Sequence, residues 1–377
     1  MHFREHIIST AKKCTTLIHT LAHSAKLNWG LKQEALNTIY KGAILPLMLY
    51  GAPVWIKAME KNCNRTLCNR VQRIMNIKIA EAYRTSSNDA LCVITGNTPI
   101  EMKAEEAANI YRITKDKKNQ LLDHENEPQE WTHLADTVRT DDQNELTDHS
   151  IHIYTDGSKH EHGVGSGIAI YIKSELTYQI KHELHSRCSN NQAEQTAIIK
   201  ALHALEAIKL SNNTPTTVKI FTDSKVTLSA LKNHKNRTHL IEEIRKKTTA
   251  LEKEDWFIEF TWIKAHAGHS GNELADELAR EATKNKEICY IEIPKSEIVR
   301  QESEKNKPKW QQHWDATTKG LVTKEYFPNI KERIKMKISL PPNFTALVTA
   351  HGQTKAYLHC FKINQYPECI CTHGNRD

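Results

Sequence analysis

The sequence predicts an α/β domain, a mixed five-stranded sheet flanked by helices, preceded by an all-α segment. Three observations support this prediction. Apolar residues recur at helical spacing through the front of the chain. Strand-like alternation begins at Ile151, and from there the order is strand, strand, strand, helix, strand, helix, helix, strand, helix. The first three strands form an antiparallel meander, whereas strands separated by a helix run parallel, so the sheet is mixed.

Length and composition limit the possible classes of protein. The 377 residues indicate two domains with an additional terminal segment. Lys and Arg total 52 against 45 Asp and Glu, a net charge of +7, which suits a polyanionic partner but equally fits ordinary solvated charge. Nine cysteines without a framework spacing indicate reduced thiols. No apolar run approaches the roughly 18 residues of a membrane span, and no secretory leader is recognisable. We expect an intracellular chain without a membrane partner; its oligomeric state stays open.

Changes in composition predict four segments. They are a helical front end at 1–120, an acidic linker at 121–148, the α/β domain at 149–284 and a charged helical tail at 285–377. Six basic side chains of the front end are candidates for phosphate contacts, with solvated helix faces as the alternative: Lys12, Lys13, Lys41, Arg65, Arg70 and Arg73.

Two aspartates end predicted parallel strands. Asp156 follows the strand that begins at Ile151, where Asp156-Gly157 is expected to turn the chain, and Asp223 follows the strand that begins at Val218. Because the carboxyl ends of parallel strands meet at one sheet edge, both side chains are expected there. One such Asp is often merely a helix cap, but two at one edge favour a site.

Two further acids lie on helices. Glu194 precedes Ile198 by four residues on an otherwise inward helix face; an edge-of-core Glu that reaches solvent is the alternative. Asp276 lies on the helix after the last strand, behind a glycine-bearing loop that carries His266. A loop histidine is usually solvated, but beside carboxylates it suits proton delivery to a leaving group.

Four converging carboxylates require cations. Hard oxygen ligands without cysteine or clustered histidine favour Mg²⁺, with Mn²⁺ as substitute. Two such ions, roughly 3.5 to 4 Å apart, suit phosphodiester hydrolysis because one activates water and the other stabilises the leaving oxygen. Without metal, repulsion should raise at least one of the four pKa values.

Four motifs together resemble type 1 ribonuclease H in order and spacing. They are Thr155-Asp156-Gly157-Ser158, Asn190-Asn191-Gln192-Ala193-Glu194, Thr222-Asp223-Ser224, and the run from Trp262 through His266 to Asp276. The resemblance covers the predicted α/β domain. It implies an endonuclease that cuts the RNA strand of RNA/DNA hybrids and leaves 3′-hydroxyl and 5′-phosphate ends.

The resemblance also implies roles for individual residues. Asp156, Glu194, Asp223 and Asp276 are the expected metal ligands, with Asp156 shared by both ions, and His266 is the expected mobile histidine. The expected contacts to the RNA 2′-hydroxyl groups come from the backbone near Gly157 and Ser158 and from Asn190, Asn191 and Gln192. Thr222 and Ser224, which flank Asp223, are expected to position phosphate. The basic protrusion of some family members is short here, which predicts low hybrid affinity for this domain alone.

The front end is similar to the region after the polymerase palm in reverse transcriptases of non-LTR retrotransposons. The resemblance rests on the run from Leu45 to Trp55, on Val71-Gln72-Arg73-Ile74-Met75, and on the run from Ile94 to Ile100. No strand-flanked pair of aspartates fits a polymerase centre, so we expect no polymerase site and a chain truncated at both ends. The alternative to an active nuclease is a catalytically silent remnant that binds nucleic acid.

The predicted tail contains two features of its own. Trp310 and Trp314, four residues apart, are expected to pack. Cys369 and Cys371 resemble half of a zinc module, and Cys360 or His373 would complete it only by departing from the usual pattern.

Overall fold

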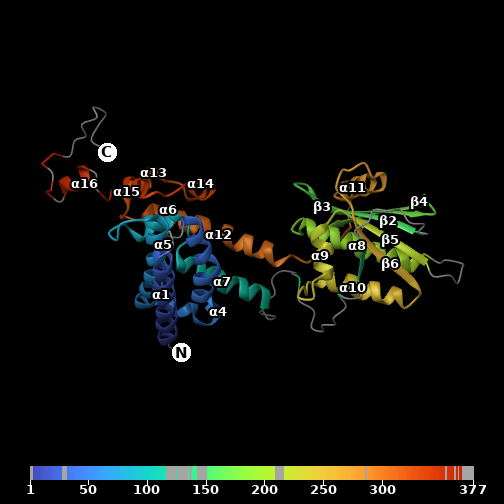
Figure 1. Cartoon of the computed structure of the whole chain (residues 1–377), viewed down its shortest axis with the longest axis horizontal. Coiled ribbons are helices and arrows are strands. Elements are labelled where there is room, and N and C mark those ends of the chain that lie inside the picture. The colour runs from blue at the N-terminus through green and yellow to red at the C-terminus, as the bar shows by residue number, and fades with distance from the viewer. Residues whose placement is uncertain are drawn as a thin grey trace. The chain divides into compact units, whose positions relative to one another are not determined.

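The computed structural model shows two compact units, each drawn in Figure 1. The helical unit comprises Met1–Asp116 and Arg300–Asp377, and the sheet unit comprises Lys117–Val299. The structure describes residues 3–27, 32–115, 125, 135, 138–141, 151–208, 216–284, 287–352, 355–360, 362–363 and 365–366. The predicted tail is thus divided between the two units, and most of the predicted linker lies outside the described residues.

The sheet unit contains a seven-stranded mixed sheet in the order β1-β6-β5-β2-β3-β4-β7. Its strands are β1 (Arg139–Asp141), β2 (Ile151–His160), β3 (Gly163–Ile172), β4 (Glu175–Leu184), β5 (Thr216–Thr222), β6 (Trp256–Trp262) and β7 (Ile288–Tyr290). The predicted class is confirmed, with β2, β3 and β4 antiparallel and β2, β5 and β6 parallel.

The predicted count of five strands is wrong. The additional strands, β1 and β7, are three residues long and pair with β6 and β4 at the two sheet edges. Such short strands contain too few residues to produce a recognisable alternation, because only their pairing partners select the extended conformation.

The chain does not turn at Asp156-Gly157 as predicted. β2 continues to His160 because it pairs with β3 along its whole length, as far as His160 opposite Gly163. Its parallel pairing with β5 does end earlier, at Thr155 opposite Thr222. Asp156 therefore lies where the parallel pairing stops, although the strand itself goes on.

Helices cover both faces of the sheet. They are α8 (Asn190–Ala207), α9 (Lys225–Lys232), α10 (His239–Glu252) and α11 (Ser270–Ala282). Ile151 and Ile153 of β2 enter a core shared with α8 and α10, whereas Tyr154 lies against Gly271 of α11. Figure 1 shows α11 and α10 on opposite sides of the strands.

Two glycines of β3 allow close packing of a helix against the strand. A Cβ atom on Gly165 would lie 2.2 Å from the Ala279 carbonyl oxygen, and one on Gly167 would lie 2.1 Å from that of Ala275. Only glycine therefore lets α11 approach this strand so closely.

The helical unit is built from short and long helices. Its front end contains α1 (Arg4–Leu27), α2 (Gln33–Ile39), the π-helix η1 (Tyr40–Ile44), α3 (Leu45–Leu49), α4 (Ala52–Trp55), the 3₁₀ helix η2 (Ile56–Glu60), α5 (Asn62–Ala80), α6 (Asn88–Thr95) and α7 (Ile100–Lys115). Its later part contains α12 (Lys295–Ala316), whose first residues belong to the sheet unit, with α13 (Leu321–Tyr326), α14 (Ile330–Lys335), α15 (Pro342–Thr349) and α16 (Lys355–Cys360).

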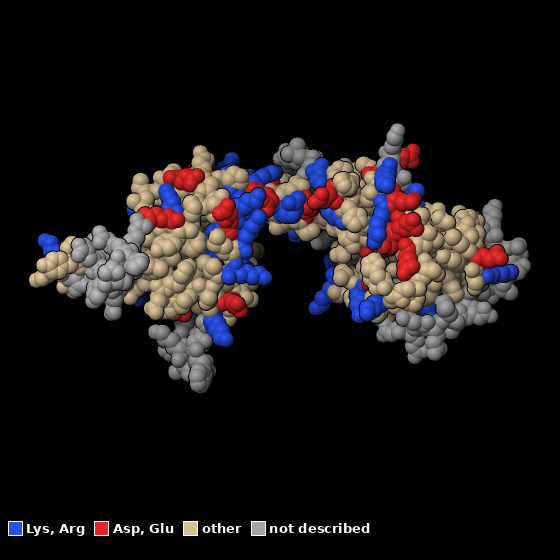
Figure 2. Space-filling model, turned by 90° about the horizontal axis from the view of Figure 1, so that it is seen from above, with Lys and Arg blue, Asp and Glu red and all other residues tan. Residues whose placement is uncertain are grey.

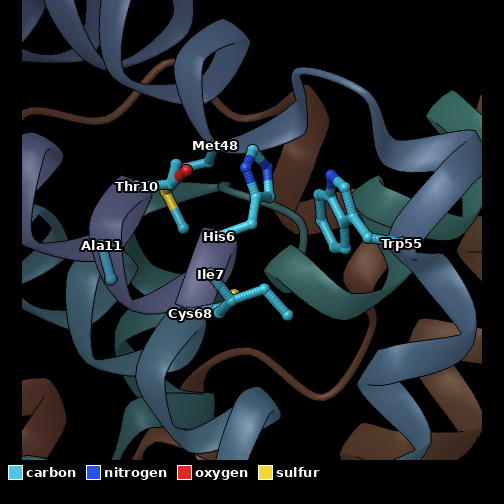
Figure 3. A pocket seen from close by; sticks show the side chains of 7 residues that line it. All are labelled: His6, Ile7, Thr10, Ala11, Met48, Trp55 and Cys68. Carbon is cyan, nitrogen blue, oxygen red and sulfur yellow. The ribbon is translucent and has the colours of Figure 1, made fainter. Parts of the chain in front are cut away.

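Two apolar clusters hold the helical unit together. One lies mainly among α1, α3, α4 and α5, and the other joins α6 to the later helices. Trp310 and Trp314 are buried in the second cluster, so their predicted packing is confirmed. A cavity of about 10 Å³ lies at the first cluster. His6, Met48, Trp55 and Cys68 are among the lining residues labelled in Figure 3. This volume holds about one water molecule, so the cavity is a packing gap.

Two predictions concern membranes and zinc. No single helix in the described ranges combines the length and apolarity of a membrane span. The neighbouring segments Gln33–Leu49 and Ala52–Glu60 reach that length and apolarity only when taken together, and the chain bends by 48° between them. The side chains of Cys360, Cys369, Cys371 and His373 lie outside the described residues.

Candidate active site

Four elements of the sheet unit contribute the four predicted acidic residues. Asp156 lies in β2, Glu194 in the second turn of α8, Asp223 directly after β5, and Asp276 in the middle of α11. Because β2 and β5 are in register at Thr155 and Thr222, the aspartates that follow start at the same level of the sheet edge. The sheet register thus fixes two of the acids relative to each other.

The four acidic side chains come together. Carboxylate oxygens of Asp156, Glu194 and Asp223 all lie within 4.8 Å of one another. The carboxyl group of Asp276 hydrogen-bonds to that of Asp156 and also forms an ion pair with Arg280, one helical turn further along α11. The convergence expected from the order of the strands and helices is therefore present in the fold.

Gly157 allows α8 to approach β2 closely enough to bring Glu194 into this group. A Cβ atom on Gly157 would lie 2.4 Å from the backbone nitrogen of Glu194 and 2.9 Å from the Cβ atom of Ala193. The Gly157 N–H also hydrogen-bonds to the carboxylates of Asp156 and Glu194. Glycine here is required by backbone proximity and not by an unusual φ angle.

Burial and mutual repulsion raise the pKa values of three of the acids. The pKa of Asp156 rises to about 8, first because the group is buried and then because Asp223 and Asp276 lie close. The pKa of Glu194 lies well above its ordinary value because of burial and the charges of Asp156 and Asp223. Burial and Asp276 also raise the pKa of Asp223, although His266 opposes the shift. Without a counter-ion, the group therefore retains protons near neutral pH.

The donor set fits divalent cations. All four candidate ligands are carboxylates, the hard oxygen donors that Mg²⁺ and Mn²⁺ prefer. Glu194 Oε2 is buried without a hydrogen-bond partner among the described residues, while Oε1 accepts from Asn190 Nδ2 at 3.4 Å. A buried carboxylate oxygen without a donor is costly, and a cation would remove that cost.

The predicted substrate contacts differ in how accessible they are. Asn190 and Asn191 are exposed at the start of α8, whereas Gln192 is buried. Gln192 closes a capping box with Ser189, and its Nε2 donates to the Glu292 carbonyl at 3.1 Å. Both ends of the Gln192 amide are thus engaged within the protein, and its substrate contact stays a prediction that would require releasing one of these bonds.

Three hydroxyl groups near the acids have partners within the protein. Ser158 Oγ lies 2.8 Å from His160 Nε2. Thr222 is buried, and its Oγ1 accepts from the Ser224 backbone nitrogen at 3.2 Å. Ser224 caps α9 by accepting from the Thr227 nitrogen at 3.3 Å. Thr222 and Ser224 therefore shape the turn after β5, and their contacts to phosphate stay predictions.

His266 is exposed on the loop between β6 and α11. Its φ angle is 51°, in the left-handed region, and Gly268 follows at 85°. A non-glycine residue in this region is uncommon, and such residues often occur at functional sites. His266 is close enough to Asp223 to oppose the rise of its pKa.

Three residues near the acids received no role in the sequence interpretation. Arg280 pairs with Asp276, and their spacing of four residues on one helix was the available signal. Trp262 Nε1 donates to the Asp223 carbonyl at 3.1 Å, and the Lys225 ammonium group lies 3.8 Å from the centre of the Trp262 ring. No sequence signal links Lys225 to Trp262, because they meet only through the pairing of β5 with β6.

Comparisons with known proteins place this site in a family context. The family model described as RNase H matches residues 148–284. Ribonuclease H of Vibrio campbellii is 30% identical over 155 residues, which cover 37% of this chain and 93% of that protein. The crystal structure of RNase H1 from Halobacterium salinarum is 21% identical and covers 35% of this chain and 96% of that one, with a TM-score of 0.28.

A second group of relatives comes from retrotransposons. The putative 115 kDa protein in type-1 retrotransposable element R1DM of Drosophila melanogaster is 32% identical over 113 residues, 30% of this chain. The matched region spans 11% of that protein. Since a family model covers the whole region that carries the four acids, and a ribonuclease H is matched over nearly its full length, the chain belongs to the ribonuclease H family.

Proposed function

We propose that the sheet unit is a Mg²⁺-dependent endonuclease that hydrolyses the RNA strand of RNA/DNA hybrids. The observation that supports this most is the approach of Asp156, Glu194 and Asp223 within 4.8 Å, with Asp276 hydrogen-bonded to Asp156. Two buried and two half-buried carboxylates so close together are strongly unfavourable unless cations or protons neutralise them. The family relationship supports the same reaction class.

Asp156, Glu194, Asp223 and Asp276 would hold two Mg²⁺ ions, with Mn²⁺ as a substitute. When bound, these ions activate water and neutralise charge on the leaving oxygen. Gly157 supplies the N–H that fixes two of the carboxylates. His266, exposed beside Asp223, would deliver the proton to the leaving 3′ oxygen, so that the products carry 3′-hydroxyl and 5′-phosphate ends.

The selection of the RNA strand would depend on 2′-hydroxyl contacts, because that group distinguishes RNA from DNA. Asn190 and Asn191 are exposed at the start of α8, four and three residues before Glu194. Their amides therefore suit such contacts, together with the backbone near Gly157 and Ser158. We place Gln192, Thr222 and Ser224 behind these groups, where their hydrogen bonds hold the contacting segments.

The test is cleavage of an end-labelled RNA/DNA hybrid by the full chain in the presence of Mg²⁺. We expect internal cuts in the RNA strand, their loss in Asp156→Asn, and normal cutting by Glu277→Gln, which removes an exposed charge from α11, one residue after Asp276. An intact hybrid with the wild-type chain, or equal cutting by Asp156→Asn, would refute the proposal. Salt-dependent binding without turnover would instead favour a silent nucleic-acid-binding remnant.

A further inference from the structure

A second polar site lies in the helical unit, remote in sequence from the four acids. A pocket of about 770 Å³ opens among α2, the ends of α5 and α6, and the segment from α14 to Pro341. The hydrogen bond from the Leu340 nitrogen to Gln33 Oε1, at 3.0 Å, ties this segment to α2. Residues about 300 positions apart in the sequence therefore form one pocket.

The pocket contains a buried cation, Arg333, for which the described residues supply no carboxylate partner. Arg333 is 5% exposed, and its guanidinium group donates to the Ile94 carbonyl at the end of α6 and, at 3.4 Å, to the Met336 carbonyl. Its Nε has no hydrogen-bond partner among the described residues. Burial lowers the pKa of Arg333, which indicates that neutral carbonyl groups do not offset the cost of burying this charge.

A second unpaired polar atom lies in the same lining. Asn37 Oδ1 is buried and has no hydrogen-bond partner in the described part of the chain. If the amide is turned around, its Nδ2 takes that place, so one end of the amide lacks a partner in either orientation. These two unpaired atoms leave hydrogen-bonding capacity in the pocket that a polar ligand could use.

The charges of the lining favour an anion. Its basic residues are Lys32, Lys41, Arg333 and Lys337, and its acidic residues are Glu34 and Glu81. Figure 2, seen from the side on which α14 lies in Figure 1, shows both basic and acidic side chains on the helical unit. The surface is therefore not uniformly basic, and the four basic against two acidic residues of the lining give this pocket a net positive charge.

We propose that this pocket binds a phosphodiester segment of a single nucleic-acid strand. The geometry supplies one buried guanidinium group, three exposed lysines around it and an amide for a sugar hydroxyl or base edge. A volume of about 770 Å³ exceeds that of one phosphate group and accommodates a nucleotide with its neighbours. Residues 1–80 hold twelve Lys and Arg but three acidic residues, which suits a polyanion.

The test measures binding of a fluorescent single-stranded DNA 12-mer to the full chain in EDTA, by anisotropy at several salt concentrations. We expect Lys41→Gln/Lys337→Gln to reduce the slope of log K against log salt by about 1.4, because each phosphate contact on a single strand contributes about 0.7. Asn37→Asp, which adds a negative charge with little change of shape, should weaken binding at least about tenfold.

The matched control is Lys331→Gln/Lys335→Gln, which removes two exposed charges from α14 outside the pocket lining. An unchanged slope in the pocket variant, or an equal loss in the control, would overturn the proposal. Inorganic phosphate should compete only at millimolar concentrations; competition at the concentration of the oligonucleotide would mean that the site takes free phosphate and not a strand. Because EDTA removes divalent ions, the result does not depend on nuclease activity.

Discussion

The raised pKa of Asp156 makes the active-site charge a measurable source of instability. In the folded chain this pKa is about 8, against an ordinary value of 3.8. An acid with a higher pKa in the folded than in the unfolded state binds more protons when folded. The folded state therefore loses stability as pH rises from about 4 to about 8, and the loss is complete above pH 8.

The perturbation is Asp156→Asn in the metal-free protein. For an isolated group, the difference between the folded and unfolded pKa values lowers the free energy of unfolding by about 6 kcal/mol above pH 8. Glu194 and Asp223 share protons with Asp156, so we expect the substitution to recover about half of this, about 2–3 kcal/mol at pH 9. At pH 5, Asp156 is protonated in the folded chain but already ionised in the unfolded chain, so only about a quarter of the loss has accumulated and the gain should be less than about 1 kcal/mol.

The assay is urea unfolding of the full chain in EDTA at pH 9 and at pH 5, followed by hydrogen exchange in peptides from β2 and α8. Mg²⁺ should stabilise the wild-type chain at pH 9 but not the variant, because the variant lacks the proposed ligand Asp156. Glu277→Gln serves as control, since it removes an exposed carboxylate from α11. Equal stability of Asp156→Asn and wild type at pH 9, or a gain of the same size at pH 5, would refute this reasoning.

Three further substitutions test other parts of the sheet unit. Gly157→Ala places a Cβ atom 2.4 Å from a backbone nitrogen of α8, so we expect a loss of about 1–3 kcal/mol in urea unfolding and loss of hybrid cleavage. Arg280→Gln frees Asp276 from its ion pair, and a Mg²⁺ titration of cleavage should show a half-saturating concentration up to about fivefold lower; an unchanged value would contradict this role. Arg245→Met leaves Glu242 buried without its counter-ion and should cost about 3–5 kcal/mol in the free energy of unfolding, much of which the added change Glu242→Leu should restore.

Much of the sheet unit could be predicted from local patterns. The alternation after Ile151 and the helical spacing after Glu194 follow from the periods of strands and helices, which depend on neighbouring residues alone. The convergence of the acids could also be inferred, because parallel strands in one sheet place their carboxyl ends at one edge. Metal binding by these acids and the substrate contacts remain predictions for the experiments above.

Other features could not be read from local patterns. The extension of β2 to His160 is stabilised by pairing with β3, and the three residues of β7 form a strand only beside β4. Gln192 resembled a substrate contact by position, but its amide closes a helix cap and reaches the Glu292 carbonyl, 100 residues away. Such contacts depend on which distant segments pack together, and no period in the sequence encodes that.

The sequence by itself determined the order of the strands and helices, the identity of the acids and their resemblance to one family. The tertiary structure alone decided that the segment after Arg300 packs with the front helices and that Arg333 is buried, with its Nε unpaired among the described residues. The physical reason is the range of the interactions. Backbone periodicity acts over a few residues, whereas burial, charge and strand pairing are set by segments that the chain brings together only on folding.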